Sequence, residues 1–118
     1  MKEFMLFIST EGDPMASLSA AQKQQHVQKV GAYIKGLVEN GQMKAAQPLE
    51  MAGVKISKKG STFTDGPFNE SKEVITGYYH ILAGDLDQAK EIAKADPRFN
   101  DGHWTIEIRP IMKVEGIN

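Results

Sequence analysis

Three residues of this chain, His26, Asp65 and Asp96, stand at positions that suit proton transfer, and they lie in separate segments. His26 falls within a predicted helix, whereas Asp65 and Asp96 each stand beside a turn signal. An imidazole that titrates near neutrality suits general acid or base catalysis, and a carboxylate can orient its ring. The sequence therefore offers His26 as a proton carrier, with Asp65 or Asp96 as the group that orients it.

Each of these residues also has a purely structural interpretation. His26 lies about 70° from the centre of the helix's apolar stripe at 100° per residue, where a histidine at the edge of the core would lie. Asp65 suits an Asx-type turn, in which its carboxylate accepts nearby backbone N–H groups. Asp96 precedes a proline and suits a helix end. Both interpretations stay open for all three residues.

Aromatic side chains gather in the stretch 63–82, which reads as turn chemistry followed by a strand. Tyr78 and Tyr79 are adjacent in that strand, so they must point to opposite faces. We expect one of them in the core and the other lining a cavity with its hydroxyl available. Gly66 and Pro67 predict a stiff loop over Asp65–Phe68, anchored by Phe68. Tyr78, Tyr79 and Phe68 form the predicted ligand-binding set.

The helices and strands that must position these residues are predicted from the spacing of apolar residues and from turn and capping signals. Glu3–Ser9 predicts a strand that is apolar on both faces. Ser19 and Gln22 form a capping box that begins a helix, which runs to about Asn40 and stops at Gly41. Its predicted inner stripe consists of Val27, Val30, Ile34, Leu37 and Val38.

After this helix the sequence predicts further strands and a second helix. We expect strands over 42–49, 73–82 and 103–110, a small hairpin over 53–64, and a second helix capped by Asp85. Leu86, Ala89, Ile92 and Ala93 are its predicted inner stripe. Gly77 inside the third long strand indicates a bulge or a close backbone approach.

This order predicts one domain over residues 1–118 of the α+β class. It is the ferredoxin-like βαββαβ arrangement with a small inserted hairpin, in which two helices cover one face of a four-stranded antiparallel sheet. Because the first strand is apolar on both faces, the other face needs a cover too. We therefore expect a homodimer formed through the sheet face, or a polar row that meets water.

Composition narrows the classes of function. A net charge of −1 without clustered Lys and Arg argues against nucleic-acid binding. The chain has no cysteine, which suits a reducing compartment, and its N-terminal apolar run is too short for a signal peptide or a membrane span. We expect a cytoplasmic protein without membrane contact. We find no metal-ligand spacing and no cofactor motif, so no metal or cofactor is expected.

Several segments, taken in order, resemble one family. Asp65-Gly66-Pro67-Phe68, then Glu70-Ser71-Lys72-Glu73, then Gly77-Tyr78-Tyr79, is similar to the signature of the DGPF branch of the YCII-related family. The resemblance covers nearly the whole chain and extends to Asp85–Ala89 and Glu107–Pro110. It implies a dimeric α+β barrel and a small-molecule activity that uses a His–Asp pair, for which Asp96-Pro97 matches the family's Asp-Pro.

Three functions of different class remain open. The first is a cofactor-independent enzyme that isomerises a small polar or hydroxylated ring substrate, or eliminates a group from it, in a dimer cavity. The second is a non-catalytic dimer that binds a small ligand with Asp65 and Tyr78 or Tyr79. The third is an accessory protein linked to sigma-factor-dependent transcription, because DGPF-type proteins often accompany such factors.

Overall fold

The structure is a computed structural model that describes residues 1–67 and 73–118. Its elements follow the predicted order, with one extra short 3₁₀ helix. They are β1 (Lys2–Glu11), α1 (Ala20–Glu39), β2 (Met43–Pro48), β3 (Val54–Lys59), β4 (Thr62–Pro67), β5 (Glu73–Ala83), α2 (Leu86–Lys94), η1 (Pro97–Asn100) and β6 (Trp104–Pro110).

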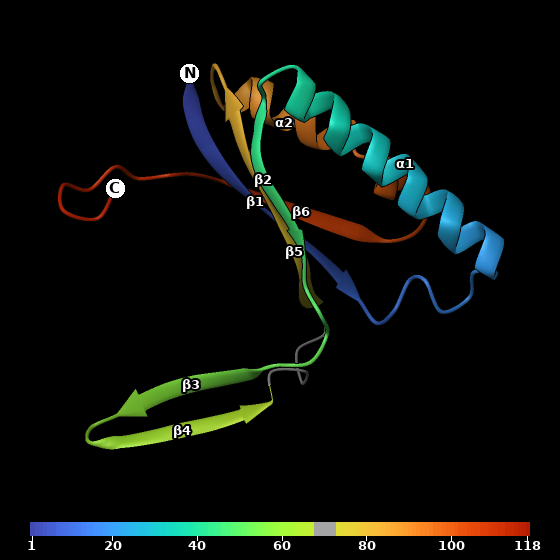
Figure 1. The fold of residues 1–118 in the computed structure, drawn as a ribbon. Coiled ribbons are helices and arrows are strands. Elements are labelled where there is room, and N and C mark those ends of the chain that lie inside the picture. The colour runs from blue at the N-terminus through green and yellow to red at the C-terminus, as the bar shows by residue number, and fades with distance from the viewer. Residues whose placement is uncertain (68–72) are drawn as a thin grey trace.

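Four strands form an antiparallel sheet in the order β2-β5-β1-β6. Both helices lie on one side of it, and no helix of the described residues covers the opposite side (Figure 1). The strands that flank each helix are separated in the sheet by another strand, as the split βαβ topology requires. The predicted ferredoxin-like α+β fold is confirmed.

The start and end of α1 agree with the sequence signals. The Ser19 hydroxyl accepts a hydrogen bond from the Gln22 amide at 3.1 Å, and the Gln22 side chain accepts one from the Ser19 amide at 2.8 Å. This reciprocal pair satisfies two N–H groups that the first turn leaves without helical partners. Gly41, at φ 72°, takes the left-handed conformation that ends the helix.

The buried stripe of α1 differs from the predicted one. Val30 and Leu37 are buried, but Val27 and Val38 are 64% and 53% exposed, and His26 is buried in their place. The inner line passes close to His26, Val30 and Leu37, so Val27 and Val38 lie about 80–100° away from it. The predicted stripe was therefore wrong for Val27 and Val38, whereas His26 is buried outside the hydrophobic core cluster.

Gly77 lies both at a bulge and at a close backbone approach, the two roles that its position in the strand predicted. The register between β1 and β5 shifts opposite this glycine, which marks a bulge. A Cβ added to Gly77 would stand 2.9 Å from the backbone oxygen of Gln47 in β2. Glycine lets the edge strand approach this closely, and Pro48 then ends that strand.

Strands β3 and β4 form a separate two-stranded sheet that extends away from the helices (Figure 1). Val54, Ile56 and Phe63 are each about two-thirds exposed on it. The predicted stiff loop was wrong for residues 65–67, because they continue β4 and pair with β3. Phe68, the last residue of the predicted loop, lies outside the described residues, so its role as an anchor stays a prediction.

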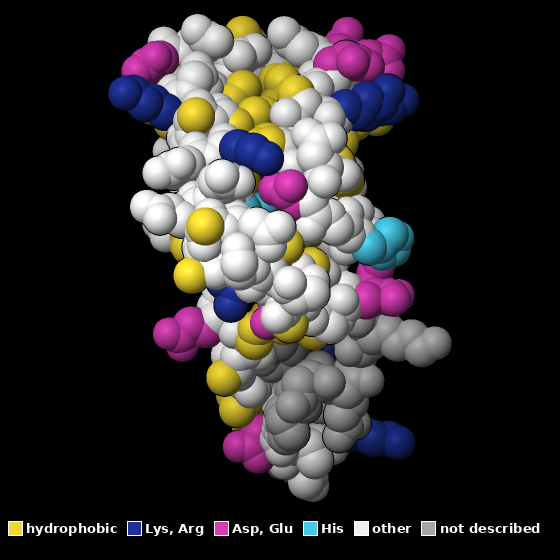
Figure 2. Space-filling model, turned by 90° about the vertical axis from the view of Figure 1, so that its right-hand side faces the viewer, with side chains coloured by type: hydrophobic (Ala, Val, Ile, Leu, Met, Phe, Trp, Pro, Cys, Tyr) yellow, Lys and Arg dark blue, Asp and Glu magenta, His cyan; other side chains and the backbone are white. Residues whose placement is uncertain are grey.

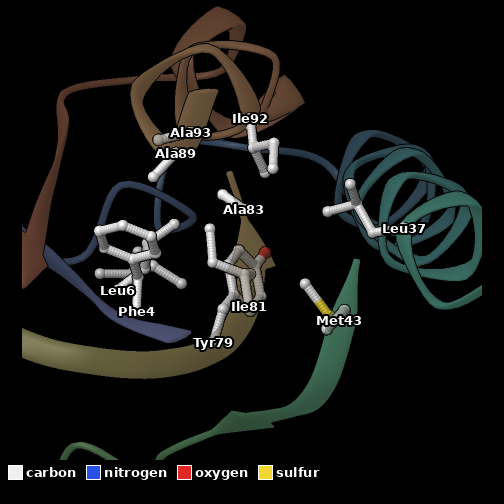
Figure 3. Packing of buried hydrophobic residues seen from close by; sticks show 11 residues of the cluster. Phe4, Leu6, Leu37, Met43, Tyr79, Ile81, Ala83, Ala89, Ile92 and Ala93 are labelled. Atoms are coloured by element: carbon white, nitrogen blue, oxygen red, sulfur yellow. The ribbon is translucent and has the colours of Figure 1, made fainter. Parts of the chain in front are cut away.

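The core fills the space between the sheet and the helices (Figure 3). Phe4, Leu6 and Ile81 come from the central strands, and Ala89 and Ile92 from α2. The small alanines of α2 let that helix approach the sheet closely. Leu86 was predicted to join them but is 48% exposed, because it is the first residue of the helix. No helix in the described part of the chain is long and apolar enough to span a membrane.

Candidate functional site

A pocket of about 360 Å³ opens between α1, the edge strand β2 and the helix-covered face of the sheet. Its walls are mostly apolar, with a few polar side chains among them. It is lined by Ile8, His26, Val27, Val30, Gly31, Ile34, Ala46, Gln47, Pro48, Tyr79 and Arg98. A concave apolar site with few polar groups has the composition of a small-molecule site.

His26 enters this wall from α1 and meets a carboxylate behind it. Its Nδ1 lies 2.8 Å from Oδ2 of Asp101, which follows η1, and the His26 residue is 7% exposed. Its ring stacks on Trp104 at 5.9 Å between centroids and 17° between planes. Lys29, one turn along α1, places its ammonium 3.9 Å from the other oxygen of Asp101.

This contact defines the roles of the two ring nitrogens. When the imidazole is neutral, Nδ1 donates its proton to Asp101, and Nε2 carries the lone pair. Among the described residues no group forms a hydrogen bond with Nε2. The stacking on Trp104 and the bond to Asp101 hold the ring in one orientation. Such a ring can take a proton from a bound molecule and return it.

A second buried cluster adjoins the first. The Asp96 side chain is fully buried and accepts hydrogen bonds from the Arg98 amide at 2.9 Å, Arg98 Nη1 at 3.0 Å and the Tyr79 hydroxyl at 3.1 Å. Arg98 Nη1 also donates to the Tyr79 hydroxyl oxygen. The buried charge is thus paired and hydrogen-bonded, as burial requires. Arg98 is held at a fixed place on the pocket wall.

Tyr79, which is buried, and Tyr33, which is partly buried, have raised pKa values for a shared reason. Burial raises the pKa of Tyr79 to about 12, and the neighbouring Asp96 charge pushes that pKa up while Arg98 pulls it down. Burial also raises the pKa of Tyr33, whose hydroxyl donates to the backbone oxygen of Ile92. Both phenols therefore stay protonated as hydrogen-bond donors near neutral pH.

The structure brings some of the predicted site residues together and separates others. His26 and Tyr79 line one pocket, and Asp96 lies directly behind Tyr79. Asp65 is exposed on the projecting β3–β4 hairpin, away from α1 (Figure 1). The carboxylate that meets His26 is Asp101, where the sequence had suggested Asp65 or Asp96.

Tyr78 points to the opposite face of the sheet from Tyr79, as alternation required. It lines a second cavity of about 520 Å³, together with Phe7 and Ile75 of the sheet and Leu49 and Lys55 toward the hairpin. The two tyrosines therefore serve different cavities. A ligand-binding role for either one stays a prediction.

A charged cluster lies at the far end of the sheet from these cavities. Glu3 accepts hydrogen bonds from Lys44 at 3.0 Å and His80 at 2.8 Å and forms an ion pair with Lys113 at 2.6 Å. The contact with Lys113, followed by those with Lys44 and His80, lowers the pKa of Glu3 to about 2. Lys113 belongs to the C-terminal tail, so the cluster ties that tail to β1.

Sequence reasoning missed Asp101 and Arg98. Both lie in the polar segment 97–102, where no periodicity marks one side chain over another. The turn of η1 directs them toward α1 and the core. No local pattern marked them, because their contacts with α1 and the core depend on the path of η1 beside α1. On the helix side of the molecule, positive and negative side chains are interspersed with hydrophobic ones (Figure 2).

Comparison with protein families identifies the chain. The family of the YCII-related domain matches residues 4–115, nearly the whole length. The chain belongs to the YCII-related family. The comparison with curated proteins gave no match. The matched range includes every residue of the His26–Asp101 and Asp96–Arg98–Tyr79 clusters, so this YCII-related domain carries the whole candidate site.

Proposed function

We propose that this YCII-related protein is a cofactor-independent enzyme that moves a proton on a small polar or hydroxylated ring substrate. The observation that carries the proposal is the 2.8 Å contact between His26 Nδ1 and Asp101 at the wall of an apolar pocket. An imidazole oriented by a carboxylate is a common form of general base. The apolar walls would keep water away from the transferred proton.

In the proposed reaction, Nε2 of His26 takes a proton from a carbon next to a carbonyl group. The electron pair of the broken C–H bond forms a C=C bond, and the carbonyl oxygen takes the negative charge of the resulting enolate. In an isomerisation, the resulting imidazolium returns the proton at another carbon. In an elimination, the electron pair expels a leaving group from the neighbouring carbon, and the imidazolium gives its proton to that group or to water. Asp101 stabilises the imidazolium in both cases, because it accepts from Nδ1.

The test measures hydrogen–deuterium exchange on candidate substrates, so it needs no assumption about the product. The protein is incubated in D₂O with a panel of small cyclic ketones, lactones and hydroxyquinones, and NMR follows deuterium incorporation. We expect exchange on some members and a loss of about 10²-fold or more in His26→Gln. His80→Gln is the matched control, since His80 lies in the Glu3 cluster, and it should keep the rate.

Two results would contradict this proposal. One is an unchanged exchange rate in His26→Gln. The other is the absence of exchange across the panel together with ligand-induced stabilisation of the fold, which would favour the non-catalytic ligand-binding protein.

We also propose that the protein forms a homodimer through the face of the sheet that carries no helix. That face presents half-buried Met5 and Phe7 and exposed Ile75. The hairpin adds exposed apolar side chains beside it, and an isolated two-stranded hairpin is marginally stable in water. We also propose that the chain belongs to the DGPF branch of the family, on the basis of its tetrapeptide Asp65–Phe68.

A further inference from the structure

We infer that the pocket between α1 and β2 binds a small carboxylic acid as its anion, with an apolar or aromatic body, and that Arg98 holds the carboxylate. The inference deepens the proposed function, because it names the class of molecule for the same pocket. It rests on the placement of one ion pair relative to the pocket and on the chemistry of the lining.

The Asp96–Arg98 pair has its positive end toward the pocket. The Asp96 side chain is fully buried, whereas the Arg98 side chain is 15% exposed and belongs to the pocket lining. Its contacts with Asp96 and Tyr79 use Nη1. Among the described residues, none accepts a hydrogen bond from Nη2 or Nε. A guanidinium edge of this kind fits the two oxygens of a carboxylate.

The guanidinium is also held rigidly before any ligand arrives. It lies over the rings of Tyr79 and Trp104, with 5.6 Å and 5.7 Å from its central carbon to the two centroids. A fixed Arg loses little conformational freedom when it binds an anion. This arrangement differs from that of Arg109, the other arginine of the chain, whose side chain is 71% exposed on β6.

The rest of the lining selects for an apolar body. No carboxylate lines the pocket within the described ranges 1–67 and 73–118, since Asp96 and Asp101 lie behind Arg98 and His26. Val30, Ile34 and other apolar side chains form most of the wall. Its volume of about 360 Å³ lies near the lower end of the range for ligand pockets, roughly 300–1,000 Å³. A single substituted ring matches this description.

The experiment uses three probes: benzoate, its neutral analogue benzamide, and acetate, which lacks the ring. Trp104 is the only tryptophan of the chain and contacts both Arg98 and His26, so its fluorescence reports on this site. We expect benzoate to bind with a Kd on the order of 1 mM, because the binding free energy of a ligand with about nine non-hydrogen atoms is limited. Benzamide and acetate should each bind about tenfold more weakly or worse.

Variants locate the bound carboxylate. Arg98→Lys keeps the charge but loses the planar fork, so we expect benzoate affinity to fall about tenfold. Arg109→Lys is the matched control and should leave that affinity unchanged. If Arg98→Lys does not fold, the ¹⁵N-labelled wild-type protein decides: benzoate must shift the Nε–H resonance of Arg98 and leave that of Arg109 in place.

Three outcomes would overturn the inference: no benzoate binding, equal binding of benzoate and benzamide, or binding that leaves the Arg98 resonance and the Arg98→Lys affinity unaffected. The deuterium-exchange assay separates this inference from the proposed function. If the enzyme proposal fails, no exchange is seen, but the wild-type protein still binds benzoate and Arg98→Lys still weakens that binding. If the carboxylate inference fails, deuterium exchange on uncharged ring substrates still depends on His26.

Discussion

Replacing Asp96 with asparagine tests whether the buried cluster beside the pocket is chiefly structural. The substitution keeps the shape of the side chain and removes its charge. Three donors share that charge, two from Arg98 and one from Tyr79. An asparagine can accept from the Arg98 amide, but its NH₂ group then faces the other two donors. The guanidinium of Arg98 therefore loses its counter-charge.

The size of the effect follows from burial. Removing one partner of a buried ion pair costs about 3–5 kcal/mol, because the other charge remains without compensation. Arg98 keeps 15% of its side chain exposed and is partly hydrated there, which favours the lower end. We therefore expect a loss of about 3 kcal/mol in the free energy of unfolding. For a chain of this length, that lowers Tm by roughly 12 °C.

Urea denaturation followed by circular dichroism measures this loss by linear extrapolation. Asp65→Asn is the control, because Asp65 is exposed on the hairpin, and it should change the free energy of unfolding by less than about 0.5 kcal/mol. A loss below about 1 kcal/mol for Asp96→Asn would refute the structural reasoning. If such a stable variant also lost deuterium exchange, Asp96 would belong with the catalytic groups.

Further predictions concern other parts of the molecule. Light scattering at micromolar concentration should give the mass of a dimer for the wild-type protein and that of a monomer for Phe7→Glu; a monomeric wild type would contradict the proposed interface. The Glu3 carboxylate, with its pKa lowered from 4.5 to about 2, stabilises the fold above pH 4.5, and this contribution should disappear as the pH falls toward 2; an unchanged pH dependence of unfolding in Glu3→Gln would contradict this. The phenol of Tyr79 binds its proton more tightly in the folded state, so stability should fall as the pH rises from 10 to 12, less steeply in Tyr79→Phe than in the wild-type protein. Gly77→Ala should cost about 1–3 kcal/mol of unfolding free energy, since its Cβ meets the Gln47 backbone oxygen at 2.9 Å; a neutral effect in thermal denaturation would show that β2 can shift.

The sequence alone determined the order of elements and the topology. The capping box at Ser19, the turn at Gly41 and the alternation in the central strands are local signals, so they can be read without knowledge of the fold. The role of Gly77 was also predictable, because a glycine inside an apolar strand is typical of a bulge or a close backbone approach. The opposite faces of Tyr78 and Tyr79 followed from the period of two.

Only the tertiary structure decided which carboxylate meets His26. Asp101 lies 75 residues from His26 in the sequence, and their contact depends on how η1 passes beside α1. The inner line of α1 was likewise set by packing against the sheet, which buried His26 and left Val27 exposed. Side-chain type and spacing define what chemistry a chain can perform. Which groups perform it together depends on long-range packing, which no local pattern encodes.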